Sequence, residues 1–307
     1  MGEGMQTERE LLTEICERID RHARGDMHTR IDGLLLSKAA GSSRPDYTVT
    51  EPLLVVMARG GKRIMVGDEV YEYRTGEMLI VTASLPVTGH YLETDQPSLG
   101  MGLELRPAAL AELALRAPAR PALRTGSAGS AIAVGNADAE MLDAAARLLR
   151  LLDRPDDAPV LAPLVEQEIL WRLLTGPHGD TVRQIALADS ALTYINRAIT
   201  WMRDNYASPV RIEDLARMAG MSTSVFHRHF RAVTAMSPLQ FQKRIRLQQA
   251  RSLLVSQPGD VAAVAHLVGY DSASQFTREY RRMFGAPPGQ DAARLRAAHA
   301  PEPALLP

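Results

Sequence analysis

Between residues 47 and 106 the apolar positions occur in short runs that glycines and prolines interrupt. The runs are rich in β-branched and other apolar residues and lie between turn-forming residues, which is typical of strands in antiparallel sheets. They lie at residues 53–57, 63–66, 70–73, 78–81 and 99–105. This part of the chain is therefore predicted to form an antiparallel sandwich or barrel.

After residue 106 the spacing of apolar residues changes to that of helices, which are predicted over residues 138–152 and 163–174. The first helix carries four leucines on one face: Leu142, Leu148, Leu149 and Leu152. These leucines either cover the barrel or form the seam of a dimer, and the pattern leaves both uses open. Residues 175–180 contain glycine and proline and end the helical pattern, which indicates a junction between two parts of the chain.

An internal repeat with a spacing of about fifty residues occupies the last third of the chain. Ser222, Phe226, Arg228, Arg231 and Pro238 recur as Ser272, Phe276, Arg278, Arg281 and Pro288. In each copy an apolar helix, at 212–219 or 261–268, leads through a glycine and a small polar residue to a second helix. This is the order of a helix-turn-helix, in which glycine permits a left-handed turn and serine caps the next helix.

The second helix of each copy has an aromatic face, which is predicted to be buried, and a polar face. The polar faces hold Thr223, Ser224, His227, Arg228 and Arg231 in the first copy, and Ala273, Ser274, Thr277, Arg278 and Arg281 in the second. A helix of this kind can enter the major groove of DNA, where arginine reads guanine and hydroxyls read several base edges.

A connector helix is predicted between the two copies. Ser237-Pro238-Leu239-Gln240 has the pattern of a capping box, and the helix continues to Val255 with Lys243, Arg244 and Arg251 on its outer face. A rigid connector is expected to hold the two polar faces about 34 Å apart, which is one turn of DNA.

The distribution of charge supports a polyanionic partner for this region. Residues 1–187 hold 20 Lys and Arg against 27 Asp and Glu, whereas residues 188–307 hold 15 against 9. A net charge of −7 is thus followed by one of +6. A basic segment favours phosphate neutralisation and counterion release, although the same charge also occurs on solvated helical bundles.

Residues 190–296 resemble the AraC/XylS family of bacterial transcription regulators. The resemblance is carried by Gly220-Met221-Ser222, Phe226-His227-Arg228-His229-Phe230, Ser237-Pro238, Val268-Gly269-Tyr270 and Phe284-Gly285, together with Pro287-Pro288. It implies base contacts from Ser224, His227, Arg228, Ala273, Ser274, Thr277 and Arg278. It implies phosphate contacts from Ser222, Thr223, Arg231, Ser272, Gln275 and Arg281.

The N-terminal half looks like the cupin-like domain of one branch of this family, through Arg44-Pro45-Asp46-Tyr47, Gly76-Glu77-Met78-Leu79 and Leu85-Pro86-Val87. The likeness implies an α+β chain of two domains, with effector binding in the barrel and a homodimer formed through flanking helices. Candidate effector-pocket residues are Tyr47, Met57, Tyr71, Tyr73 and His90. The expected domains are residues 1–180 and 189–298, with a linker at 181–188 and a tail at 299–307.

The sequence therefore predicts a dimeric, effector-responsive regulator that binds double-stranded promoter DNA, with RNA polymerase as a further partner. An enzymatic cupin would need several metal ligands, and the strand region holds only His90, so neither metal nor cofactor is expected. A fused metal-dependent cupin, an alkyl-accepting repair protein and an effector-independent DNA-binding adaptor are the alternatives. The repair protein needs several cysteines, and the chain has one.

That cysteine, Cys16, is interpreted as an apolar filler of an N-terminal helix, with a reactive sensor thiol as the alternative. The absence of a long apolar run and of a signal-peptide pattern, together with the single cysteine, predicts a cytoplasmic protein without a membrane span.

Overall fold

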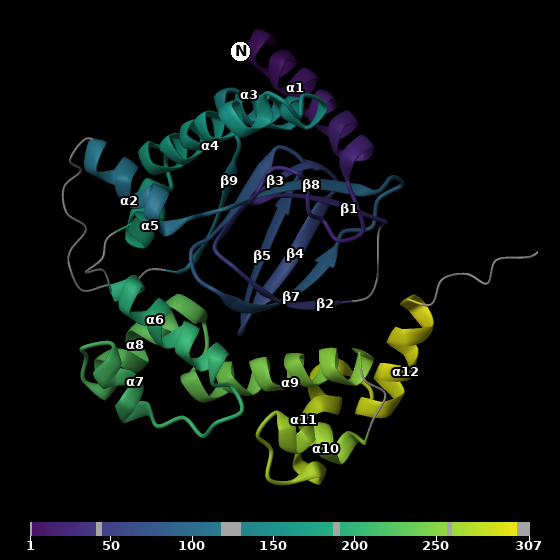
Figure 1. Cartoon of the computed structure of the whole chain (residues 1–307), viewed down its shortest axis with the longest axis vertical. Coiled ribbons are helices and arrows are strands. Elements are labelled where there is room, and N and C mark those ends of the chain that lie inside the picture. Colours follow the sequence, from purple (N-terminus) through teal and green to yellow (C-terminus); the bar gives the residue numbers. More distant parts are fainter. Residues whose placement is uncertain (1, 41–44, 118–129, 187–190, 257–259, 300–307) are drawn as a thin grey trace, which may run out of the picture.

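The computed structural model describes residues 2–40, 45–117, 130–186, 191–256 and 260–299. Figure 1 shows its layers: helices α1, α3 and α4 cover one β-sheet, a second sheet lies beneath the first, and helix α9 runs below the second sheet. We refer to residues 2–186 as the N-terminal part and to residues 191–299 as the C-terminal part. The predicted α+β architecture is confirmed, with strands confined to the first part and helices alone in the described second part.

The first sheet has five antiparallel strands in the order β1-β8-β3-β6-β9. Their bounds are β1 (Leu34–Ala39), β8 (Ser98–Glu104), β3 (Leu53–Arg59), β6 (Glu77–Val81) and β9 (Ile132–Asn136). The second sheet has four antiparallel strands in the order β2-β7-β4-β5. These are β2 (Asp46–Thr50), β7 (Leu85–Tyr91), β4 (Gly61–Val66) and β5 (Glu69–Arg74).

The two sheets form a barrel-like sandwich that is not closed, since no strand pairing joins them in the described chain. Its core is filled with large apolar side chains such as Leu54, Met57, Ile80 and Leu85, each at most 1% exposed. Close packing of this kind supplies the hydrophobic stabilisation that holds the sheets face to face.

Helices α1 (Gly2–His22), α3 (Ala139–Arg150) and α4 (Ala158–Thr175) form the layer over the first sheet, and the short helix η1 (Leu151–Asp153) links α3 to α4. The predicted leucine face, Leu142, Leu148, Leu149 and Leu152, is at most 3% exposed at each position. These leucines are therefore packed within this layer, which leaves no leucine seam on the surface of α3. Helix α2 (Pro107–Arg116) packs against α5 (Gly179–Ala186), and α5 contains most of the predicted linker.

The C-terminal part consists of two helix-turn-helix units joined by α9 (Pro238–Ser256), as the repeat predicts. The first unit has α6 (Ala191–Asp204), α7 (Ile212–Met218) and α8 (Thr223–Thr234), and the second has α10 (Val261–Leu267), α11 (Ala273–Phe284) and α12 (Pro288–His299). Helix α9 has 19 residues, so it is about 28 Å long, and it contacts β2 and β7 of the second sheet. Residues 300–307 of the predicted tail lie outside the described residues.

The Arg246 side chain on α9 joins the two units. Its guanidinium donates hydrogen bonds to the carbonyl oxygens of Tyr206 (2.7 Å), Ala207 (3.1 Å) and Ser208 (3.1 Å) before the first helix-turn-helix. It also donates to the carbonyl of Gly269 (2.8 Å), which lies in the turn of the second. The loop between α6 and α7 and the turn of the second unit are thereby fixed against one another.

Gly269 also has to be glycine for its backbone to approach the other unit. Its φ is +86°, and a Cβ placed there would lie 2.1 Å from the carbonyl oxygen of Ala207. Gly220, at the same place in the first unit, has a φ of +64° but nothing within 4 Å of its would-be Cβ. The positive φ therefore favours glycine at both positions, but of the two only Gly269 is also required by the close approach of another backbone segment.

We predict that Gly269→Ala destabilises the fold by about 1–3 kcal/mol more than Gly220→Ala, because both pay for the left-handed backbone but only the first also overpacks. Equilibrium urea unfolding of the two variants measures the difference. If the two variants lost the same free energy of unfolding, the close approach of Gly269 to Ala207 would not contribute to the cost of the substitution.

Candidate nucleic-acid interface

Helix α8 buries its aromatic face and leaves its polar face open. The Ser222 hydroxyl caps it by accepting a hydrogen bond from the backbone N–H of Val225 (3.4 Å), while Phe226 and Phe230 are fully buried. At 100° per residue the predicted base-contacting residues fall on the opposite side. Ser224, His227 and Arg228 are exposed, as are Ser222, Thr223 and Arg231.

Helix α11 repeats this arrangement. Ser272 caps it through the N–H of Gln275 (3.3 Å), and Phe276 and Tyr280 are fully buried. Ser274, Gln275, Arg278 and Arg281 are exposed, whereas Ala273 and Thr277 are half-buried. The Thr277 hydroxyl donates a hydrogen bond to the carbonyl of Ala273 (2.9 Å), so these two positions present less free surface than their counterparts in α8. We call α8 and α11 the reader helices.

Aromatic rings pack against the buried face of each reader helix. Phe230 of α8 contacts Phe241 of α9 with ring centroids 5.4 Å apart, and Phe276 of α11 contacts Tyr270 of the preceding turn at 5.3 Å. Such aromatic pairs add specific geometry to hydrophobic burial. Each reader helix is thus fixed to its own unit through the face that cannot reach a ligand.

The four repeated arginines on the exposed faces have no carboxylate at ion-pair distance among the described residues: Arg228, Arg231, Arg278 and Arg281. Guanidinium groups left without protein anions are suited to bidentate contacts with phosphate or guanine. By contrast His229, next to Arg228, is 4% exposed, and burial lowers the pKa of its imidazole. His229 is therefore a packing residue, while His227 is exposed.

The N-terminal part covers the side of α9 that was expected to face solvent. The Arg251 guanidinium lies 4.8 Å from the centroids of both the Tyr47 and Phe284 rings, which contact each other edge to face at 4.7 Å, and the Tyr47 hydroxyl donates to the carbonyl of Met283 (3.2 Å). Arg244 donates to the carbonyl of Gly67 (3.3 Å). The placement of Arg244 and Arg251 on an outer face was wrong, because the helical pattern of α9 does not reveal the second sheet that packs on it.

The polar face of α11 stays open in this docked arrangement. Met283 lines the cleft beside the second sheet, whereas Ser274 and Arg281 lie on another side of the helix and are exposed. The N-terminal part therefore contacts the C-terminal part behind the reader helices rather than over their polar faces.

The five candidate effector-pocket residues lie in different places. Met57 and Tyr73 are buried in the sandwich, and burial raises the pKa of the Tyr73 phenol. The Tyr71 hydroxyl forms hydrogen bonds with the side chains of Glu69 and Ser130, and burial raises the pKa of the Tyr71 phenol to about 12. His90 lies opposite Arg63 in the second sheet, and Tyr47 reaches the C-terminal part.

Two further sequence hypotheses concern metal and thiol chemistry. The described residues contain no group of three or more His, Cys, Asp or Glu side chains that could hold a metal ion. The Cys16 thiol donates to the carbonyl of Ala58 (3.4 Å), and burial raises its pKa. A thiol in that state is a poor nucleophile, which favours the interpretation of Cys16 as a filler.

The second reader helix depends on a buried carboxylate. Asp291 of α12 is fully buried and accepts hydrogen bonds from Arg251 (2.8 Å), Arg294 (2.7 Å) and the Tyr280 hydroxyl (3.1 Å). Burial alone would raise the pKa of Asp291, but these donors outweigh it and the pKa is lowered. Asp291 thereby ties α9, α11 and α12 together.

We predict that Asp291→Asn lowers the free energy of unfolding by about 3–5 kcal/mol at pH 7, because it leaves the Arg251 charge buried and unpaired. Because the pKa of Asp291 is lower in the folded state than in the unfolded state, its ionised form stabilises the fold at pH values above the unfolded-state pKa of about 4. This stabilisation is lost as the pH falls through the folded-state pKa. The difference between variant and parent should therefore shrink below about pH 4.

Urea unfolding between pH 3 and pH 7 tests this expectation. The matched control is Asp214→Asn, which removes an exposed carboxylate 3.2 Å from Arg217 and should cost less than about 1 kcal/mol. A gap between Asp291→Asn and the parent that stays constant with pH would contradict the role given to this carboxylate.

Family models match both parts of the chain. The model of the AraC-type transcriptional regulator N-terminus matches residues 30–181, and a helix-turn-helix domain model matches residues 215–294. The HTH-type transcriptional regulator ExsA of Pseudomonas aeruginosa is 28% identical over 132 residues, which are 43% of this chain and 47% of ExsA. The virulence regulon transcriptional activator VirF of Yersinia enterocolitica is 31% identical over 148 residues, 47% of this chain and 52% of VirF. The chain thus spans about half the length of the curated relatives it matches.

Solved structures of ToxT from Vibrio cholerae share the fold. An apo form superposes with a TM-score of 0.55 over 87% of this chain and 99% of its own, at 9% identity. A form bound to an unsaturated fatty acid gives 0.52 over 87% and 97%, at 11% identity. The described residues contain no helix that is long and apolar enough to cross a membrane.

Proposed function

The chain belongs to the family of AraC-type transcriptional regulators, and from this we propose that it is a sequence-specific DNA-binding regulator of transcription. The supporting observation is the pair of reader helices, each with a buried aromatic face and an exposed polar face that carries two arginines. Both helices would enter successive major-groove segments of one duplex, and Arg246 would fix their relative orientation.

We propose that the base-contacting set is Ser224, His227 and Arg228 of α8 with Ser274, Thr277 and Arg278 of α11, and that Ala273 contributes an apolar contact. Ser222, Thr223, Ser272 and Gln275 at the helix starts, and Arg231 and Arg281 about two turns further along, would contact phosphates. Because Ala273 and Thr277 are half-buried, we expect α11 to make fewer base contacts than α8.

The regulator would respond to a small-molecule effector bound by the N-terminal part or at its border with the C-terminal part. The effector acts through its differential affinity for two arrangements of the parts, since a ligand without such a difference shifts no equilibrium. We place the regulator in the cytoplasm, beside promoter DNA and RNA polymerase, and we propose no catalytic activity for it. A DNA-binding adaptor without an effector is the second candidate, and ligand-independent promoter affinity would identify it.

We predict that Arg228→Ala and Arg278→Ala each weaken binding to a selected duplex by roughly 1–3 kcal/mol and relax preference at one base position. Arg231→Ala and Arg281→Ala should weaken binding to all sequences alike and reduce the slope of log affinity against log salt by about one ion each. Fluorescence anisotropy on duplexes enriched from a random library, at several salt concentrations, measures both effects.

Arg154→Ala is the matched control, because it removes an exposed cation of the N-terminal part near η1. It should leave affinity and salt slope unchanged. If all four reader variants behaved like this control, the two helices would not be the DNA-contacting elements.

We propose a homodimer that forms through the start of α4 instead of the leucines of α3. Val160, Leu161 and Leu164 are 67%, 41% and 59% exposed on neighbouring turns of α4. Apolar side chains clustered on a surface mark interaction sites, whereas single exposed ones are ordinary.

The double variant Val160→Glu with Leu164→Glu should therefore shift the chain to a monomer, because charges cannot be buried unpaired in an apolar contact. Sedimentation velocity measures the change in mass. Leu115→Glu serves as control, since Leu115 is a single exposed leucine of α2, at 89% exposure. A parent chain that is already monomeric, or a double variant that stays dimeric, would contradict this interface.

A further inference from the structure

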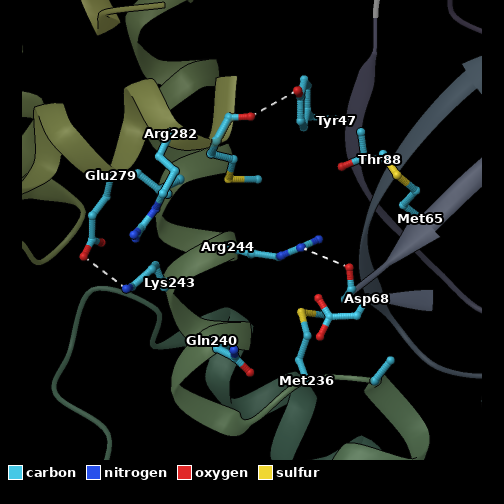
Figure 2. Close-up of a pocket in the computed structure, with 14 residues that line it drawn as sticks. Tyr47, Met65, Asp68, Thr88, Met236, Gln240, Lys243, Arg244, Glu279 and Arg282 are labelled. Atoms are coloured by element: carbon cyan, nitrogen blue, oxygen red, sulfur yellow. Dashed lines mark hydrogen bonds and ion pairs between the residues drawn. The ribbon is translucent and has the colours of Figure 1, made fainter. Parts of the chain in front are cut away.

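A cleft of about 530 Å³ lies between the second sheet and the C-terminal part. Figure 2 shows Tyr47, Met65, Asp68 and Thr88 of the N-terminal part on one side and side chains of α9 and α11 on the other. Pockets for small molecules usually span about 300–1,000 Å³ and lie between structural units. The volume and position of the cleft are thus those of a ligand site.

Much of the cleft wall is apolar and adaptable. Met65, Met236 and Met283 line it together with Leu247 and the Tyr47 ring. Methionine side chains are flexible and polarisable, so they adapt to irregular alkyl or aryl groups. This wall suits the apolar body of a ligand.

Arg244 is a cation in the cleft to which the described residues offer no carboxylate at ion-pair distance. Its guanidinium donates one hydrogen bond, to the Gly67 carbonyl at 3.3 Å, and no carboxylate lies within ion-pair distance of it among the described residues. The side chain is half-buried, and this burial lowers the pKa of Arg244, although Asp68 opposes the shift. A partly desolvated guanidinium with free donors gains from a bound anion.

The other charges of the cleft limit the charge of that anion. Lys243 is already paired with Glu279 at 3.0 Å, Arg282 lies nearby, and Asp68 faces Arg244. Three cationic and two anionic side chains leave a formal excess of one positive charge. A single negative charge balances the cleft, whereas a dianion would be repelled by the Asp68 and Glu279 carboxylates.

We propose that this cleft binds an amphipathic monocarboxylate, with its carboxylate on Arg244 and its apolar body against the methionines. This inference rests on the proposed function, since it names the chemical class and the site of the effector. The ligand would contact β2, β4, α9 and α11 together. It would therefore stabilise the docked arrangement of the two parts relative to an arrangement in which they separate.

The test uses the full chain with 4-phenylbutanoate and decanoate as probes, and with 4-phenylbutan-1-ol, decan-1-ol and inorganic phosphate as comparisons. Isothermal titration calorimetry and thermal denaturation should show binding of both acids and a raised melting temperature. The alcohols and phosphate should bind about 10- to 100-fold more weakly, as expected for the loss of a charge-assisted contact or of the apolar body.

Arg244→Gln should weaken binding of both acids about 10- to 100-fold, as replacing the acids by the alcohols does. The glutamine side-chain amide can still donate a hydrogen bond to the Gly67 carbonyl. Arg244→Lys keeps the charge and should bind with an intermediate affinity, which separates a loss of charge from a failure to fold. Arg63→Gln is the matched control: Arg63 lies two residues from Met65 on β4, but its guanidinium is paired with Glu72 at 2.7 Å and is 51% exposed. It should bind the acids as the parent does.

The proposal is overturned if neither acid binds, if the alcohols bind as well as the acids, or if Arg244→Gln binds like the parent. Selection of duplexes from a random library separates this outcome from failure of the proposed function. A chain that selects DNA but binds neither acid refutes the cleft alone. A chain that binds the acids through Arg244 but selects no DNA refutes the DNA-binding role and leaves the cleft standing.

Discussion

The Arg246 guanidinium holds together the two halves of the DNA-binding region. Its hydrogen bonds run to three consecutive carbonyls, those of Tyr206, Ala207 and Ser208, and to that of Gly269 in the other unit. Gln242, one turn earlier on α9, donates to the Tyr206 and Ser208 carbonyls at 3.0 and 2.6 Å. Because hydrogen bonds from a charged guanidinium are stronger than those from a neutral donor, these contacts hold this loop and this turn in a defined relative position.

The rest of the C-terminal part depends on that junction. Aromatic contacts fix α8 to α9 and α11 to the turn before it, and Asp291 of α12 joins α9 to α11. Both polar faces are then presented by one rigid body. The N-terminal part docks behind this body through the cluster of Tyr47, Arg251 and Phe284, so docking leaves the polar faces of the reader helices exposed.

Features encoded by local pattern could be predicted from the sequence, and features that depend on distant packing could not. The repeat predicted both helix-turn-helix units because the cap, the glycine and the aromatic face of each copy lie within a few turns of one another. Strand β7 was missed because Pro86 and Gly89 look like strand breakers. Pro86 is tolerated because β7 pairs there with β2 alone, through Val49, and β4 begins to pair only at Thr88.

The same limit applies to the candidate site. The exposed arginines of the reader helices follow from helical periodicity, and they have no carboxylate partner within the described part of the chain. The sequence does not single out Arg244, because the helical pattern of α9 does not distinguish it from a solvent-exposed cation. Its position in the cleft depends on the packing of the second sheet on α9. Tyr47 was singled out for its residue type, but its contact with Met283, more than two hundred residues away in the chain, could not be inferred from pattern.

These contacts also determine what an effector can change. Separating the two units would break either the hydrogen bond of Arg246 to Gly269 or its three hydrogen bonds to residues 206–208, and a hydrogen bond to a charged group contributes roughly 1.5–3 kcal/mol. Coupling energies between ligand sites are typically about 1–3 kcal/mol. An effector is therefore expected to leave the geometry between the reader helices intact and to act on the softer border around Tyr47 and Arg244. There it can shift the paired units as one body relative to the N-terminal part.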